Sequence, residues 1–177
     1  QAMLIRPCHD GEFDTLLAII NAAASKYRGV IPDDCWHEPY MSSQHLRDEI
    51  ADGVQFIAAE IDGSLAGVMG IQPVRNVELI RHAYVRPEFQ GRGLGGALIA
   101  HLKSQSHRQI LVGTWRAATW AIRFYETHQF QLVPESVKAE LLKTYWTIPA
   151  RQIDTSVVLA SPALNVNEAQ RLMQASR

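Results

Sequence analysis

Apolar and polar positions repeat along the chain with two periods, which together predict a fold of mixed helices and strands. Runs rich in β-branched and aromatic residues predict strands, and apolar residues spaced by three and four predict helices. The predicted strands are Met3–Ile5, Gln55–Ile61, Leu65–Ile71, Val77–Val85, Gln109–Thr114, Phe130–Val133 and Ile153–Leu159. The predicted helices are one capped by Asp10, one starting at Leu94, and Gln44–Ala51, Ala117–His128, Glu135–Tyr145 and Asn165–Ala175.

The order of these elements predicts how the sheet is built. Asp62-Gly63 joins two strands as a tight hairpin turn, so those strands should be antiparallel. The helix from Leu94 stands between Val77–Val85 and Gln109–Thr114, and a strand-helix-strand unit of this length makes its two strands parallel. We therefore expect an α/β sandwich whose sheet is mixed and mainly antiparallel, with one parallel pair and helices on both faces.

Length and composition predict a single globular domain. The chain has 177 residues, of which 47% are hydrophobic, and no repeat or long linker divides it. We expect one domain over residues 1–177, with a core at about residues 3–160 and a helical tail at 161–177. The apolar face of that tail predicts a homodimer.

Four glycines stand where the strand Val77–Val85 gives way to the next helix. Gly91, Gly93, Gly95 and Gly96 have no Cβ atoms, so backbone N–H groups can point outward at the positive end of the helix dipole. A phosphate or pyrophosphate is the expected ligand of such a loop.

Two nucleotide-binding motifs do not fit this loop. A P-loop would end in Gly-Lys-Ser or Gly-Lys-Thr, and no such sequence follows. The spacing of Gly91–Gly96 does match G-x-G-x-x-G, but a dinucleotide fold also needs an acidic residue about 20 positions later. No Asp or Glu occurs from Phe89 to Tyr125, so the group that would bind the ribose is missing.

A third motif accounts for the loop and for a downstream segment. Gln90–Gly95 reads Q-x-x-G-x-G, and the downstream segment is Ala121–Glu126 with Gln129-Phe130. With these motifs, the chain from about Met3 to Ala160 resembles the GNAT superfamily of acyl-CoA-dependent N-acetyltransferases.

The resemblance implies a cosubstrate and an activity. The expected activity is direct transfer of an acetyl group from acetyl-CoA to a primary amine of a small molecule or peptide, without a metal ion. The pantetheine arm should pair along Ala83, Tyr84 and Val85. The pyrophosphate should bind the backbone amides of Gln90, Gly91, Arg92, Gly93, Leu94, Gly95 and Gly96.

Tyr125 is the candidate acid for the departing thiolate. A phenol with a pKa near 10 stays protonated at neutral pH, and Tyr125 matches the tyrosine with this role in many GNAT enzymes. The alternative is a tyrosine that only packs in the core. Two positions depart from the family pattern: Ala118 replaces an asparagine and Gln129 replaces a glycine. Ala118 keeps open a noncatalytic acyl-CoA-binding module as the alternative function.

Two residues on one predicted strand are candidates for the general base. Glu78 lies where several GNAT enzymes keep a glutamate, and partial burial would raise its pKa. His82 has the same strand parity and titrates near neutral pH without help. A solvated Glu78 and a packed, hydrogen-bonded His82 are equally good interpretations, so both alternatives stay open.

The acyl acceptor should bind to the segments outside the two motifs. The predicted aromatic contacts are Tyr27, Trp36, Tyr40 and Trp146. Asp33, Asp34 and Glu38 could attract a cationic amine, although such a charge cluster is more often a solvated face.

Charge and cysteine content limit the other partners. A net charge of -1 predicts no nucleic-acid partner, and no apolar run of 18 residues predicts a membrane span. Cys8 and Cys35 lack the spacing of a metal site, and no signal peptide is recognisable. We therefore expect a cytoplasmic protein that binds no metal.

Overall fold

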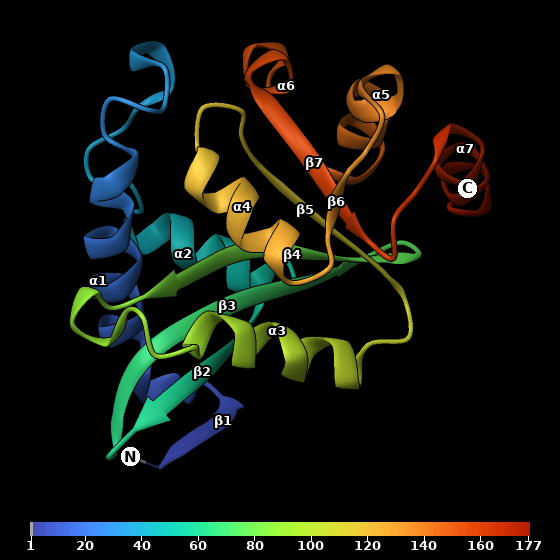
Figure 1. Cartoon of the computed structure of the whole chain (residues 1–177). Helices are drawn as coiled ribbons and strands as arrows, with labels where there is room; N and C mark the ends of the chain where they lie inside the picture. The colour runs from blue at the N-terminus through green and yellow to red at the C-terminus, as the bar shows by residue number, and fades with distance from the viewer. Residues whose placement is uncertain (1) are drawn as a thin grey trace. The chain divides into compact units, whose positions relative to one another are not determined.

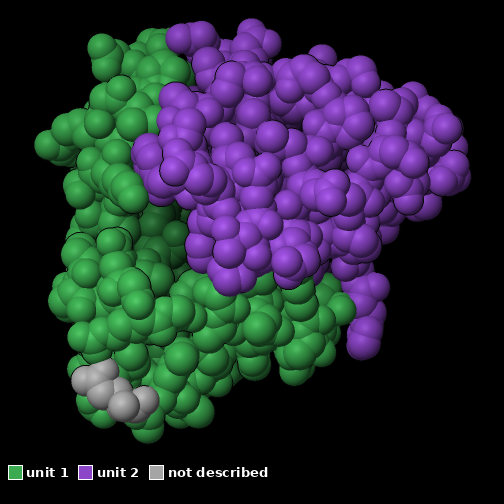
Figure 2. Space-filling view, in the orientation of Figure 1, with its two compact units in different colours: residues 1–72, 80–106 green, residues 73–79, 107–177 purple. Residues whose placement is uncertain are grey.

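The computed structural model describes residues 2–177, which form two compact units (Figure 2). The first unit comprises residues up to 72 and residues 80–106, and the second comprises residues 73–79 and 107–177. Two strands, β3 (Ser64–Val74) and β4 (Val77–Val85), have residues in both units. The single domain predicted from the sequence stays a prediction.

The strands form one mixed sheet, and its class is the one that the sequence predicted. The strand order over the described residues is β1-β2-β3-β4-β5-β7-β6, with one parallel pair, β4 and β5. The β4 residues that share a unit with β5 are 77–79. The strands are β1 (Met3–Pro7), β2 (Gln55–Ile61), β3 (Ser64–Val74), β4 (Val77–Val85), β5 (Gln109–Trp115), β6 (Gln131–Leu132) and β7 (Ser156–Ser161).

Helices connect most of the strands (Figure 1). The α-helices are α1 (Phe13–Ala24), α2 (Ser43–Ala51), α3 (Leu94–Gln105), α4 (Thr119–Thr127), α5 (Glu135–Tyr145), α6 (Ala150–Thr155) and α7 (Val166–Ala175). Short 3₁₀ turns are η1 (Asp10–Glu12), η2 (Ser25–Tyr27), η3 (Asp33–Cys35) and η4 (Pro87–Phe89). Among residues 2–177, no helix combines the length and apolar composition that crossing a membrane needs.

In the first unit, helices cover both faces of the strands. On one face, Leu16 and Ile20 of α1 and Leu46 of α2 pack in one apolar cluster with residues of β2 and β3. Helix α3 lies on the other face, as a contact of β3 shows: a Cβ atom added to Gly67 would lie 3.6 Å from Leu98 of α3. Strand residues alternate between faces, so neighbouring positions of β3 serve the two helix layers.

The β2-β3 hairpin follows the prediction from its turn sequence. Asp62 and Gly63 have φ angles of 51° and 82°, and Ile61 pairs with Ser64 across the turn. Positive φ at both turn residues is the backbone that a two-residue hairpin needs, and Asp-Gly adopts it readily.

The second unit has its own core between β7, α5 and α7. Leu141 and Leu142 of α5, Val158 of β7 and Met173 of α7 belong to one buried cluster. Two hydrogen bonds also hold α7 against this core. The Tyr145 hydroxyl of α5 donates to Asn76 at 2.9 Å, and the Asn76 amide donates to the Leu172 carbonyl of α7 at 2.9 Å.

Two element predictions were wrong. Residues 153–155 are not a strand but the end of α6, in which the amides of Gln152 and Ile153 donate to the Pro149 carbonyl. β7 is buried along its whole length, so both of its faces are covered and it lacks the expected alternation. Asp10 does not cap α1 either, because it begins η1 and the cap position belongs to Glu12.

Candidate functional site

The glycine loop, residues 90–96, comprises the connection from η4 to α3 and the first three residues of α3, in the first unit. Gly91 and Gly93 have φ angles of 79° and 77°, a left-handed backbone that residues with a Cβ atom rarely adopt. A Cβ atom added to either would meet nothing within 4 Å. The sequence therefore needs glycine here for the backbone conformation, and the space beside the loop stays open to a ligand.

The start of α3 leaves backbone donors without helical partners. The first helical hydrogen bond runs from Ala97 N–H to the Gly93 carbonyl at 3.0 Å. Leu94, Gly95 and Gly96 precede it, so their N–H groups have no acceptor within the helix, and no side chain caps the helix start. Three such donors at the positive end of a 12-residue helix suit a phosphate group.

Arginine and lysine side chains lie along this part of the chain. The Arg92 guanidinium lies over the Phe89 ring, 5.1 Å from its centroid. In α3, desolvation lowers the pKa of Lys103. Arg86 precedes η4, and its Nε atom is buried with no hydrogen-bond partner among the described residues. Glu88, which contacts Arg86 at 3.8 Å, is the one acidic residue from position 86 to 103, so this segment keeps a net positive charge, as a polyanionic ligand requires.

The end of β4 leads into this loop and lies tightly against β3. The Arg86 N–H donates to the Ala66 carbonyl at 2.8 Å. A Cβ atom on Gly67 would lie 3.3 Å from the Tyr84 carbonyl oxygen and 3.4 Å from Val85. Ala83, which the sequence predicts to contact pantetheine together with Tyr84 and Val85, is half-buried in the same stretch.

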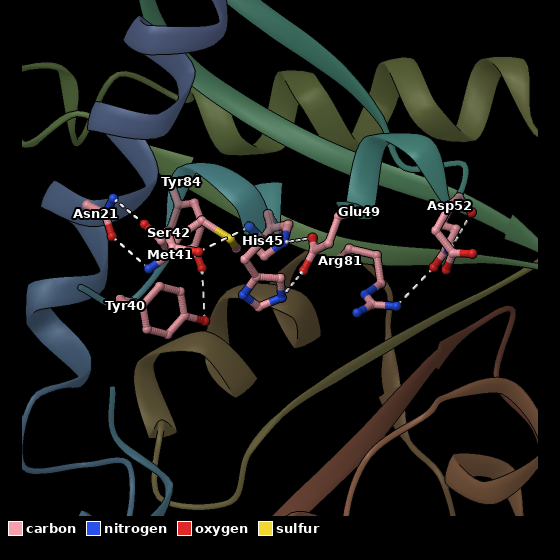
Figure 3. Close-up of polar contacts among 11 residues, drawn as sticks. Asn21, Tyr40, Met41, Ser42, His45, Glu49, Asp52, Arg81 and Tyr84 are labelled. Carbon is pink, nitrogen blue, oxygen red and sulfur yellow. Dashed lines mark hydrogen bonds and ion pairs between the residues drawn. The ribbon is translucent and has the colours of Figure 1, made fainter. Parts of the chain in front are cut away.

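His82 of β4 forms a buried pair with Glu49 of α2. The side chains are 6% and 11% exposed, and His82 Nε2 lies 2.6 Å from Glu49 Oε1. His45, one turn earlier on α2, contacts the other Glu49 oxygen at 3.0 Å (Figure 3). Burial raises the pKa of Glu49, but the hydrogen bond with His82 and the charges of His82, Arg81 and His45 lower it by more, so the net shift is downward. Glu49 is therefore an ionised acceptor at neutral pH.

The two aromatic neighbours of His82 extend the cluster. The His82 ring stacks on Phe56 at 5.9 Å and contacts Tyr84 at 5.9 Å between centroids. The Tyr84 hydroxyl donates to the Tyr40 hydroxyl at 3.5 Å (Figure 3). Burial raises the pKa of Tyr40, so its phenol stays protonated at neutral pH.

Tyr40 also lines a small cavity of about 80 Å³ in the first unit. Trp36 lines it as well, with its ring 6.0 Å from that of Tyr40. Glu38 there accepts hydrogen bonds from Arg28 at 2.6 Å and from the Trp36 indole at 2.9 Å, so its carboxylate is already paired with a cation. The other lining residues are Asn21, Ser25, Arg28 and Pro39. The structure thus brings together Trp36 and Tyr40 of the predicted acceptor contacts.

The remaining predicted residues lie elsewhere. Tyr27 ends η2 and is not among the residues lining this cavity. Glu78 and Trp146 belong to the second unit, where Trp146 lies against Gly113 of β5. Asp33 and Asp34 lie in η3, on the loop before α2. Among residues 2–177, no group of three or more His, Cys, Asp or Glu side chains could hold a metal ion.

Tyr125 stands at the end of α4, where a defined hydrogen-bond pattern closes the helix. Its side chain is 6% exposed and contacts Phe124 and Phe130 edge-to-face, at 5.1 and 5.5 Å between centroids. Phe130 N–H donates to the Tyr125 carbonyl at 3.0 Å, and Gln129 N–H donates to Glu126 at 3.3 Å. This is a Schellman motif, in which Gln129 takes the left-handed position with φ of 66°. The burial of Tyr125 is consistent both with a side chain that only packs in the core and with an acid in a site that excludes water.

Sequence reasoning missed Glu49 as a functional candidate. It had named His82, but the partner of His82 lies 33 residues away on another element. The one available signal was the spacing of His45 and Glu49, which places two titratable groups on one helix face.

Comparison with known proteins identifies the family. A family model described as an acetyltransferase (GNAT) domain matches residues 21–143, whereas no curated protein sequence gives a significant match. The PaiA N-acetyltransferase of Thermoplasma acidophilum, solved with coenzyme A, superposes with a TM-score of 0.67 at 17% identity, over 90% of this chain and 98% of that chain. The ribosomal-protein-S18-alanine N-acetyltransferase of Escherichia coli gives 0.62 at 16% identity, over 90% and 92%. Because the family model covers more than half of the chain, this protein belongs to the GNAT acetyltransferase family.

Proposed function

We propose that the protein is an acetyl-CoA-dependent N-acetyltransferase that acetylates a primary amine by direct transfer in a ternary complex. The observation that carries the proposal is the start of α3, where the N–H groups of Leu94, Gly95 and Gly96 lack helical partners beside a glycine-shaped, positively charged loop. Family membership makes coenzyme A the phosphate-bearing ligand that fits. Its pyrophosphate would accept hydrogen bonds from residues 90–96, and its pantetheine would pair with Ala83–Val85.

The reaction needs a neutral amine, a stabilised oxyanion and a proton for the thiolate. The amine nitrogen attacks the thioester carbon, and the carbon–sulfur bond then breaks. A backbone N–H near Tyr84 is the proposed donor to the oxyanion. Tyr125 is the proposed acid for the sulfur, which requires its hydroxyl to reach the thioester in the complex.

The alternative is a noncatalytic acyl-CoA-binding module of the same fold. Ala118 supports it, because this buried residue stands at the N-cap of α4 with no side-chain capping bond, where the family pattern has an asparagine. Loss of one hydrogen bond to pantetheine weakens positioning, yet it leaves the glycine loop intact.

A screen for amine-dependent thiol release separates the two functions. The protein is mixed with acetyl-CoA and a chromogenic thiol reagent, and amines are added one at a time: a polyamine, free amino acids, an aminoglycoside, and peptides with a free N-terminus or lysine. The peptide with an N-terminal alanine follows the substrate named for the Escherichia coli neighbour. Amine-dependent release supports the enzyme. Tight CoA binding by calorimetry without release for any amine supports the module.

A further inference from the structure

The buried pair of His82 and Glu49 has a feature that packing alone does not explain. His82 Nδ1 is buried and has no hydrogen-bond partner among the described residues, although the other ring nitrogen is firmly held at 2.6 Å. A buried polar atom without a partner costs about 1–3 kcal/mol, so each such atom in a folded protein calls for an explanation.

The protonation state of the ring follows from its partner. Glu49 is ionised at neutral pH and can only accept hydrogen bonds, so a neutral His82 must carry its proton on Nε2. The unshared electron pair is then on Nδ1. This nitrogen is a proton acceptor whose ring is fixed by Phe56 on one side, by Tyr84 on another and by the carboxylate behind it.

The pair also connects to the acceptor side of the first unit. Tyr84 contacts the His82 ring and reaches the Tyr40 hydroxyl, and Tyr40 lines the cavity with Trp36. Nδ1 itself is buried, so an amine in that cavity would reach it through a water molecule.

We propose that Glu49 orients His82 as the general base of the acetyl transfer, and that His82 Nδ1 takes a proton from the acceptor amine through one bridging water. This inference rests on the proposed function. A base held by a carboxylate on its far nitrogen is a recurring arrangement in acyl transfer, because the carboxylate fixes the tautomer and stabilises the imidazolium that forms. Glu49 is a positioning residue, since it acts through His82.

The acceptor amine loses two protons in the reaction, and each has its own acceptor. The ammonium form of the acceptor gives one proton through water to His82 Nδ1, and the freed electron pair forms the carbon–nitrogen bond. The carbon–sulfur electrons leave on sulfur, and the second amine proton ends on the CoA thiol with Tyr125 as carrier. His82 returns its proton to solvent, so the products are the amide, free CoA and one proton.

The decisive variant is Glu49→Gln, compared with Asp48→Asn on the same helix. The amide oxygen introduced by Glu49→Gln can still accept a hydrogen bond from His82 Nε2, but the side chain lacks the charge that stabilises the imidazolium. We expect kcat to fall by about 10- to 100-fold while KM for acetyl-CoA stays unchanged, as for loss of an aligned base. The acidic limb of the kcat/KM profile should also move to lower pH. Asp48 is exposed and its side chain accepts a hydrogen bond from Gln44 at 2.8 Å, away from the His82 pair, so Asp48→Asn should stay within about twofold of wild type.

Several charged or titratable groups near His82 and Glu49 can affect the pH dependence of kcat/KM. The titratable or charged groups around the pair are Glu49 and His45 from α2, Arg81 and Tyr84 from β4, and Tyr40 from the loop before α2. A shift of the acidic limb in Glu49→Gln that does not occur in Asp48→Asn assigns the limb to the pair. An unmoved limb, or a kcat that falls only with the folded fraction, makes the pair structural and overturns the inference.

A measurement on the unaltered protein covers the case in which the variant does not fold. Long-range proton–nitrogen NMR of the histidine rings, at a pH where His82 is neutral, reports which nitrogen carries the proton. The proposal requires the Nε2–H tautomer, and an Nδ1–H tautomer would overturn it. If the protein binds CoA but acetylates no amine, the proposed function fails and the base assignment fails with it. If Glu49→Gln keeps the turnover of the wild type, only the assignment of His82 as a base positioned by Glu49 is refuted.

Discussion

Gln129 occupies a position that favours glycine, and replacing it should stabilise the protein. Its φ of 66° places it in the left-handed region at the end of α4, where a residue with a Cβ atom costs about 1–2 kcal/mol. Its side chain is exposed, so Gln129→Gly removes little packing.

The net gain is smaller than the relieved strain. Glycine has more freedom in the unfolded chain, which offsets about 0.4–1 kcal/mol of that gain. We therefore expect the free energy of unfolding to rise by about 0.5–1 kcal/mol. For a chain of this size that corresponds to an increase in Tm of about 1–4 °C.

Thermal and urea unfolding of the wild type, Gln129→Gly and Gln129→Ala measure this directly. Alanine also removes the glutamine side chain but keeps the Cβ atom, so Gln129→Ala should gain nothing. If the alanine variant is as stable as the glycine variant, the gain does not come from the left-handed backbone. If the Gln129→Gly variant is less stable than the wild type, the left-handed backbone at position 129 does not cost significant stability.

Three other outcomes are expected. Gly93→Val should weaken CoA binding at least about tenfold by calorimetry, because valine cannot adopt the φ of 77° that starts α3, whereas Ala100→Ser on the exposed face of that helix should bind normally. Tyr125→Phe should lower kcat by about 10- to 1000-fold with little change in KM for acetyl-CoA, and turnover within about twofold of wild type would exclude Tyr125 as the acid. The hydrogen bond from Arg6 lowers the pKa of Glu12 to about 2, so the stability that this pair contributes is complete above about pH 4.5 and is lost as the pH falls toward 2. In Glu12→Gln, the free energy of unfolding measured by urea titration should therefore fall less steeply between these two pH values.

The fold could be predicted because its strongest signals are local. Asp62-Gly63 specifies a hairpin by its own backbone preferences, and the helix between β4 and β5 makes that pair parallel by its length alone. The prediction was wrong at residues 153–155, where the same Ile153 suits a strand or a helix. Pro149 decides in favour of a helical turn there, because its carbonyl accepts the first hydrogen bonds of α6.

The glycine loop could be predicted for the same reason, since its conformation is encoded in adjacent residues. The ion pairs on the acceptor side could not, because they depend on which partner each charge finds. Glu38 was predicted to attract a cationic amine, but Arg28 holds it at 2.6 Å. That pairing joins positions ten residues apart in an irregular loop, where no periodicity indicates it.

The position of Glu49 shows why the sequence did not predict its burial against His82. In an amphipathic helix with Leu46 buried, positions 49 and 50 both lie on the inner face, and the apolar Ile50 is expected to be better buried there than the charged Glu49. The structure reverses them, because Ile50 is 42% exposed whereas the Glu49 side chain is 11% exposed against His82. Exposing an isoleucine and burying a carboxylate both act against stability. A helix oriented in this way is better explained by what Glu49 does to His82 than by the packing of α2, and this is why the charge of Glu49, rather than its volume, should control turnover.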